Sequence, residues 1–169
     1  MSTEQSVDQV VDQSLVRDLA KKLLRETAPE ELPLLRPASE RYFADPEKAL
    51  RERRQQQEVL GFGAEAAVVL LTPIVLSVAT DVLTEFATEI GKVAGSKGVS
   101  AIRAALRRLF RLEPASDEPA QVEIPPISRE QLIVVRQNAF DRAIMLDLPE
   151  AKAGLLADAV VGSLAISNS

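Results

Sequence analysis

Apolar residues recur at three- and four-residue spacing along most of the chain, and the strict alternation typical of a half-buried strand is scarce. The first stripe lies in residues 7–26, where the apolar positions are Val7, Val10, Val11, Leu15, Leu19, Leu23 and Leu24. Similar patterns cover 61–94, 99–112, 129–146 and 148–166. The fold is therefore predicted to be all-α.

Composition divides this all-α chain into three parts. Residues 1–112 are predicted to form an N-terminal helical bundle, with a hydrophobic central helix at 61–94 and a basic helix at 99–112. Residues 113–127, EPASDEPAQVEIPPI, are acidic and rich in proline, which is typical of a linker. Residues 128–169 contain the last two helical patterns around a short turn, and they predict a C-terminal helical hairpin.

Capping signals mark two of the helix starts. Asp45 directly precedes Pro46, which combines a favoured N-cap residue with proline at the first helical position. Ser128 is followed three residues later by Gln131, the spacing of a capping box. We therefore expect helices to begin at about residues 46 and 129.

Residues 27–45 form a connection that contains Pro33 and Pro37, so any helix within it is expected to be short. Thr27 and Glu30 have the spacing of a capping box. The connection also contains several leucines, one tyrosine and one phenylalanine. These apolar residues predict that it packs against the bundle.

Residues 66–80, AAVVLLTPIVLSVAT, contain no charged side chain. A helix that spans a bilayer needs roughly 20 apolar residues, and shorter runs are more often buried core helices. We interpret the run as the core of the bundle, and the alternative is a segment that enters a membrane. Pro73 lies in the middle of the run and predicts a kink in either setting.

Basic residues cluster around the helix predicted at 99–112, beside an apolar face. This pattern is typical of contact with an anionic membrane or an acidic partner, and the candidate contact residues are Lys92, Lys97, Arg103, Arg107, Arg108 and Arg111. Alternatively, the acidic linker folds back and neutralises the arginines. Nucleic acid is an unfavourable partner, because the net charge is −5 and no aromatic residues are interleaved with the basic ones.

Small residues recur along the last helix, where Gly154, Asp158 and Gly162 are four residues apart. They form a ridge that would allow a partner helix to approach closely. Asp158 lies eleven residues after position 147 in the turn, and Arg136 lies eleven before it. We therefore expect the two side chains to pair across the hairpin. If the pair is buried, removing one partner would leave the other without compensation; the alternative is that each side chain reaches solvent at an edge of the hairpin.

The composition excludes several kinds of chemistry. The chain has no histidine and no cysteine, so imidazole or thiolate metal sites and histidine- or cysteine-dependent catalysis are excluded. Asp81, Glu85 and Glu89 are spaced four residues apart, and we interpret them as a solvated helix face. We expect no catalytic, metal or cofactor site. The polar, acidic N-terminus is unlike a signal peptide, and we expect a cytoplasmic protein.

These patterns together predict a non-enzymatic interaction protein that acts by helix–helix association, with a protein partner or with itself. The alternative is a membrane-active protein in which the 66–80 helix inserts into a bilayer, conditionally or constitutively. In that case the protein would be membrane-associated.

Overall fold

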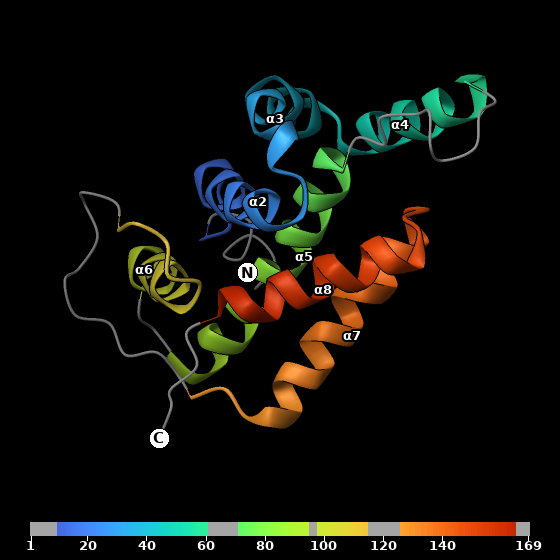
Figure 1. The fold of residues 1–169 in the computed structure, drawn as a ribbon. Coiled ribbons are helices and arrows are strands. Elements are labelled where there is room, and N and C mark those ends of the chain that lie inside the picture. The colour runs from blue at the N-terminus through green and yellow to red at the C-terminus, as the bar shows by residue number, and fades with distance from the viewer. Residues whose placement is uncertain (1–9, 61–70, 95–97, 115–125, 165–169) are drawn as a thin grey trace.

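The computed structural model describes residues 10–60, 71–94, 98–114 and 126–164, and every regular element in these ranges is a helix (Figure 1). The all-α prediction is therefore confirmed. The elements are α2 (Gln13–Thr27), the 3-10 helix η1 (Pro29–Leu34), α3 (Leu35–Ala44), α4 (Pro46–Leu60), α5 (Thr72–Ala94), α6 (Val99–Leu109), α7 (Arg129–Met145) and α8 (Glu150–Ser163).

Helix α5 is the centre of the bundle, and it contacts α2, α3, α4, α6 and α7. Its apolar side chains, from Ile74 to Ile90, are buried, and most of them are fully inaccessible to water. The interpretation of 72–80 as a core helix agrees with this burial, whereas residues 66–70 lie outside the described residues. Within the described ranges, no helix is long and apolar enough to cross a bilayer.

The start of α5 differs from the sequence prediction. The helix begins at Thr72, so Pro73 is in its first turn. Proline is tolerated there because the first N–H groups of a helix have no partner within the helix. The predicted kink at Pro73 is therefore wrong, since the proline marks the beginning of the helix.

A buried carboxylate caps this helix start. Glu31 belongs to η1 and is 3% exposed. Its two oxygens accept hydrogen bonds from the backbone N–H groups of Leu71 and Thr72, both at 2.9 Å, and from the Thr72 hydroxyl at 2.8 Å. A negative charge at a helix N-terminus also interacts favourably with the helix dipole. Glu31 therefore fixes α5 against the connection that follows α2.

The segment at 27–45 packs against the core as predicted, with Leu35 and Tyr42 buried, but it is helical for most of its length. The capping box predicted for Thr27 does not form, because its hydroxyl donates to the carbonyl of Leu23 within α2. The predicted cap at Asp45 is confirmed, since its carboxylate accepts from Lys48 N at 3.1 Å.

Helix α2 begins later than predicted. Asp12 is its N-cap and accepts from the backbone N–H of Leu15 at 2.8 Å, so the helix starts at Gln13 and does not continue from residue 7. The apolar stripe from Leu15 to Leu24 is fully buried, as its spacing indicates.

Helices α7 and α8 form the predicted hairpin and lie side by side across the bundle (Figure 1). The capping box of Ser128 and Gln131 is confirmed. Helix α8 packs on α2, and α7 packs on α5, so the hairpin shares one hydrophobic core with the N-terminal helices. The predicted linker at 113–127 falls mostly on residues 115–125, which are outside the described ranges.

Candidate functional site

Two of the arginines predicted to contact an outside partner are used within the molecule. Arg107 is 4% exposed, and its guanidinium binds Asp18 at 2.7 Å and the Ser14 hydroxyl at 3.3 Å, both on α2. Arg103 binds the Asp12 carboxylate at 3.2 Å. The acids that neutralise this part of α6 thus belong to the start of α2. The alternative, neutralisation by the acidic linker, falls mostly outside the described residues; of the linker, Glu113 accepts a hydrogen bond from Arg107 through its backbone carbonyl.

Arg111 and Lys22 both bind backbone carbonyl oxygens, at the C-terminal ends of α6 and α8. The Lys22 ammonium donates to the carbonyl oxygens of Phe110, at 2.6 Å, and Ser163, at 3.4 Å. Arg111 donates to the carbonyls of Gly162 and Ser163. Cations are favoured at helix C-termini, where the carbonyl dipoles converge. Burial lowers the pKa of Lys22, and the charge of Arg111 lowers it further.

The remaining candidate basic residues do not join these three in one patch. Lys92 lies on α5 and pairs with Glu89 at 3.7 Å on an exposed surface. Arg108 is exposed on α6, and Lys97 lies outside the described residues. Their proposed contact with a membrane or an acidic partner stays a prediction.

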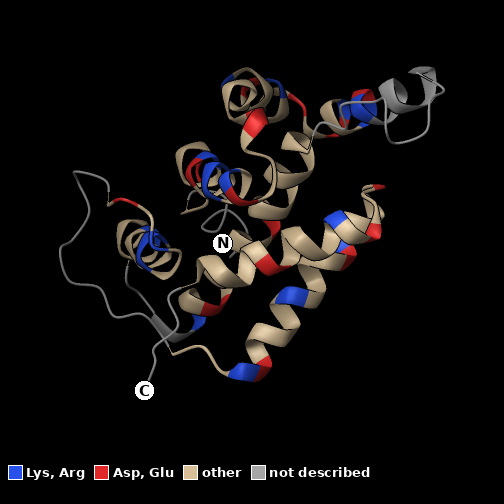
Figure 2. Cartoon of the chain, in the orientation of Figure 1, with Lys and Arg blue, Asp and Glu red and all other residues tan. Residues whose placement is uncertain are grey.

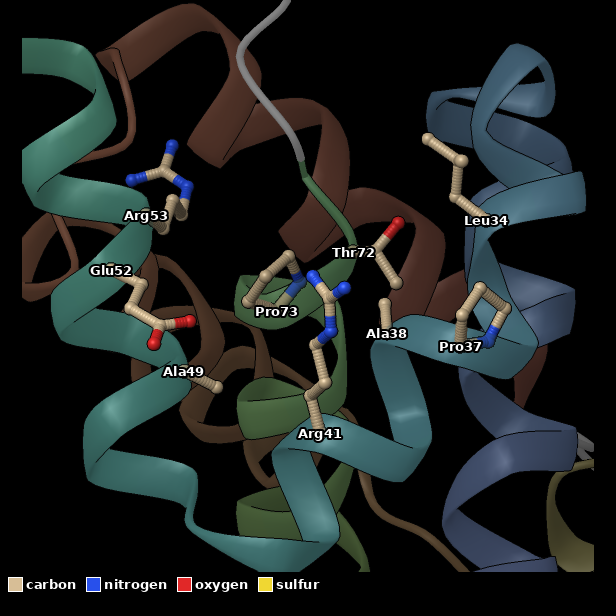
Figure 3. A pocket seen from close by; sticks show the side chains of 9 residues that line it. All are labelled: Leu34, Pro37, Ala38, Arg41, Ala49, Glu52, Arg53, Thr72 and Pro73. Atoms are coloured by element: carbon tan, nitrogen blue, oxygen red, sulfur yellow. The ribbon is translucent and has the colours of Figure 1, made fainter.

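A cleft of about 220 Å³ opens between η1, α3, α4 and the start of α5 (Figure 3). Its lining is mainly apolar, with three charged side chains, and consists of Leu34, Pro37, Ala38, Arg41, Ala49, Glu52, Arg53, Thr72 and Pro73. Arg53 donates to the carbonyl of Leu146 and so ties α4 to the hairpin. Among the described residues, no cluster of acidic side chains could hold a metal ion, here or elsewhere.

The carboxylate row on α5 faces α7 at its first two positions, where Asp81 is exposed and Glu85 is partly exposed, so the predicted solvated face also carries contacts to α7. Asp81 binds Arg142 at 2.9 Å, and Arg142 also donates to the Ser77 hydroxyl at 3.1 Å. Glu85 accepts a hydrogen bond from Asn138 at 3.4 Å. Burial raises the pKa of Asp81, and the charge of Arg142 offsets only part of that effect.

The raised pKa of Asp81 predicts a pH dependence of stability. A group whose pKa is higher in the folded state stabilises the fold when it is protonated, and this contribution is lost as the pH rises through that pKa. The free energy of unfolding of the wild type, minus that of Asp81→Asn, should therefore decrease as the pH rises from the ordinary pKa of an aspartate, about 3.9, through the higher pKa of the folded state. Urea unfolding of both proteins over a series of pH values measures this difference. A difference that increases with pH would contradict the assignment.

The most unusual surface belongs to the hairpin. Only six large hydrophobic side chains are exposed in the described part of the chain, and five of them are on α7 or α8: Ile133 (63%), Val134 (50%), Ile144 (40%), Met145 (67%) and Leu155 (60%). The sixth, Leu34, borders the cleft of Figure 3. Figure 2 shows only scattered charges along the two helices of the hairpin. The exposed large hydrophobic side chains thus concentrate on the α7–α8 hairpin.

We call the side of the hairpin that is turned away from α2 and α5 the outer face. Three apolar residues of α7 lie along it, because spacings of seven and eleven residues return to the same side of a helix: Ile133 and Ile144 are exposed, and Phe140 is partly buried against the core. Helix α8 contributes Leu155 and the ridge of small residues, Gly154, Asp158 and Gly162. A Cβ atom added to either glycine would meet no atom within 4 Å. The ridge is therefore open.

The Arg136–Asp158 pair crosses the middle of the outer face. Its Nε and Oδ1 atoms are 2.7 Å apart, so the predicted pairing and register are confirmed. The two side chains are 45% and 64% exposed, so the pair lies at the surface and the alternative of a solvent-exposed pair holds. An exposed ion pair contributes at most about 1 kcal/mol to stability. The large loss expected for a buried pair therefore does not apply.

Sequence reasoning identified the ridge but missed the exposure of its apolar neighbours. From the sequence, Ile133 and Ile144 extend the apolar arc of α7, which predicts that they are buried with it. The available signal was the sequence of α7 itself, in which apolar residues lie on nearly every side of the helix. One hairpin partner and one bundle surface cannot cover such a helix completely.

Comparison with known proteins provides no relative from which a site could be transferred. No family model, curated protein or solved structure matches the chain. The outer face of the hairpin is the strongest candidate site, because it combines exposed apolar side chains with open space above two glycines.

Proposed function

We propose that the chain is a non-enzymatic interaction protein that binds through the outer face of the α7–α8 hairpin, by helix–helix association with a protein partner or with another copy of itself. Three of the five exposed large hydrophobic side chains of the hairpin, Ile133, Ile144 and Leu155, lie on this face and carry the proposal. Apolar surface gathered in one place, rather than scattered, is typical of an interaction site.

The small residues of α8 support this function independently of the apolar side chains. Gly154 and Gly162 are two helical turns apart, with Asp158 between them. Small side chains on a helix surface allow the axis of a partner helix to approach closely, within the 8–10 Å range of packed helices. The face therefore offers both apolar contact area and room for the close approach of a partner helix.

The absence of histidine and cysteine supports a non-enzymatic role. The alternative function, membrane insertion of residues 66–80, would require the described part of that segment to leave the centre of the core. Flotation with anionic liposomes separates the two functions. Binding to the liposomes would favour insertion over the hairpin interface.

The proposal predicts that charges on the outer face abolish association without unfolding the protein. Ile133→Lys combined with Leu155→Lys should remove the proteins, or the second copies, that purify with the wild-type chain. Both side chains are mostly exposed, so the melting temperature should change little. Leu34→Lys is the matched control, because Leu34 is 42% exposed but belongs to η1. Association that survives the double variant would overturn the proposal.

A further inference from the structure

We propose that the occupant of the outer face is a second copy of this chain, docked about a twofold axis that runs along the hairpin between α7 and α8. This inference rests on the proposed function and specifies its partner. A twofold dimer requires a self-complementary surface, because both copies use the same patch. If residue i of one copy contacts residue j of the other, then residue j of the first copy contacts residue i of the second. The outer face fulfils this condition in charge and in shape.

The charges are self-complementary. Arg136 on α7 and Asp158 on α8 lie level with each other, with their charged atoms 2.7 Å apart. Rotation about the proposed axis exchanges the positions of the two helices, so it places α7 of one copy over α8 of the other. Each Arg136 then faces the Asp158 of the second copy. Four charges of alternating sign would form a closed cluster at the centre of the interface, with no like charges opposed.

The shapes are self-complementary as well. The two helices are antiparallel, so a step of four residues forward from Arg136 corresponds to a step of four residues back from Asp158. Phe140 is therefore level with Gly154, and in the other direction Leu132 is level with Gly162. Phe140 and Leu132 are partly buried against the core, so only part of each large side chain is accessible on α7, and glycines occupy the corresponding levels of α8. After rotation, Phe140 of one copy lies over Gly154 of the other, where the structure leaves space for additional atoms. The result is an antiparallel four-helix arrangement of the kind found in helical bundles.

The size of the face sets the expected strength. Helices α7 and α8 have 17 and 14 residues, which correspond to about 25 Å and about 21 Å of length. Two helices packed side by side are roughly 20 Å wide, so each copy would bury roughly 450 Å². The total is close to the roughly 1,000 Å² required for a specific interface. We therefore expect a reversible dimer whose population depends on protein concentration.

The test uses two opposite charge variants of the full chain, measured by sedimentation velocity over a wide concentration range. Asp158→Arg gives arginine at both positions of the cluster, and Arg136→Asp gives aspartate at both. Each variant alone should dimerise at least tenfold more weakly than the wild type, because like charges would face each other. An equimolar mixture of the two should regain the wild-type dimer fraction. The ion pair within each copy is broken in both variants and cannot be restored by mixing, so recovery requires contact between copies.

The contribution of shape is tested at the glycines. Gly162→Leu should weaken the dimer at least tenfold, whereas Gly91→Leu, at a helical glycine of α5 that also has open space, should leave it unchanged. A circular dichroism spectrum of each variant verifies its fold. A wild-type chain that stays monomeric, or a mixture no more dimeric than its components, would overturn the second copy as the occupant. In that case, the proposed function would still be supported if a partner protein other than this chain purified with the wild type and no longer purified with the Ile133→Lys and Leu155→Lys double variant.

Discussion

Replacing Glu31 with alanine is expected to lower the free energy of unfolding by about 3–5 kcal/mol. The substitution removes three hydrogen bonds to a carboxylate that is 3% exposed. It also leaves the N–H groups of Leu71 and Thr72 buried at the start of α5 without their acceptor, and hydrogen bonds to charged groups contribute about 1.5–3 kcal/mol each. Urea unfolding followed by circular dichroism measures the loss.

Two further variants define the origin of this effect. Glu31→Gln keeps the size of the side chain but has only one acceptor oxygen, so we expect about half of the loss. Glu30→Ala is the matched control, because Glu30 is the preceding residue of η1 and is exposed, and its replacement should cost less than about 0.5 kcal/mol. Equal losses for Glu31→Ala and Glu30→Ala would show that the cap does not stabilise α5.

Replacing Arg107 with alanine is expected to lower the free energy of unfolding by about 2–4 kcal/mol. The guanidinium is almost completely buried and binds Asp18 and Ser14 of α2. Its loss would detach α6 from α2 and leave a cavity. Asp18 is 45% exposed, so water can solvate its carboxylate in the variant, which keeps the loss below that of a fully buried pair.

The neighbouring Arg108→Ala is the control for Arg107→Ala, because Arg108 is exposed on the same helix. Its effect on the unfolding midpoint in urea should be small. A double-mutant cycle with Asp18→Ala then isolates the interaction between the two charged side chains. Strictly additive losses would show that the ion pair with Asp18 contributes nothing, and that Arg107 stabilises the fold through its packing and its other hydrogen bonds.

Features that depend on neighbouring residues could be predicted from the sequence. The caps at Asp45 and Ser128 formed as expected, because each requires only a side chain and a backbone N–H three residues away. The pairing of Arg136 with Asp158 was predictable by counting from the turn, since a short connection fixes the register of two antiparallel helices.

Features that depend on distant residues could not be predicted in this way. Glu31 and the start of α5 are separated by about 40 residues, and Arg107 and Asp18 by 89. No local pattern reports such contacts. The start of α5 also carried a usable signal, since Pro73 favours the first turn of a helix, but the charge-free run around it suggested one continuous helix. The burial of the outer face was also overestimated. An apolar sequence indicates that a surface is covered, but it does not indicate whether the same chain or another molecule covers it.

The contacts of Lys22 bear on how the chain folds as it is synthesised. Lys22 binds the carbonyl of Ser163, which is 141 residues further along, and α2 packs on α8. At about 5–20 residues per second, a ribosome needs about 7–28 s to make the intervening chain. During that time the buried stripe of α2 lacks its final cover, and the growing polypeptide exposes apolar surface to chaperones or to neighbouring nascent chains. Completion of this fold is therefore a late event that depends on α8 leaving the exit tunnel.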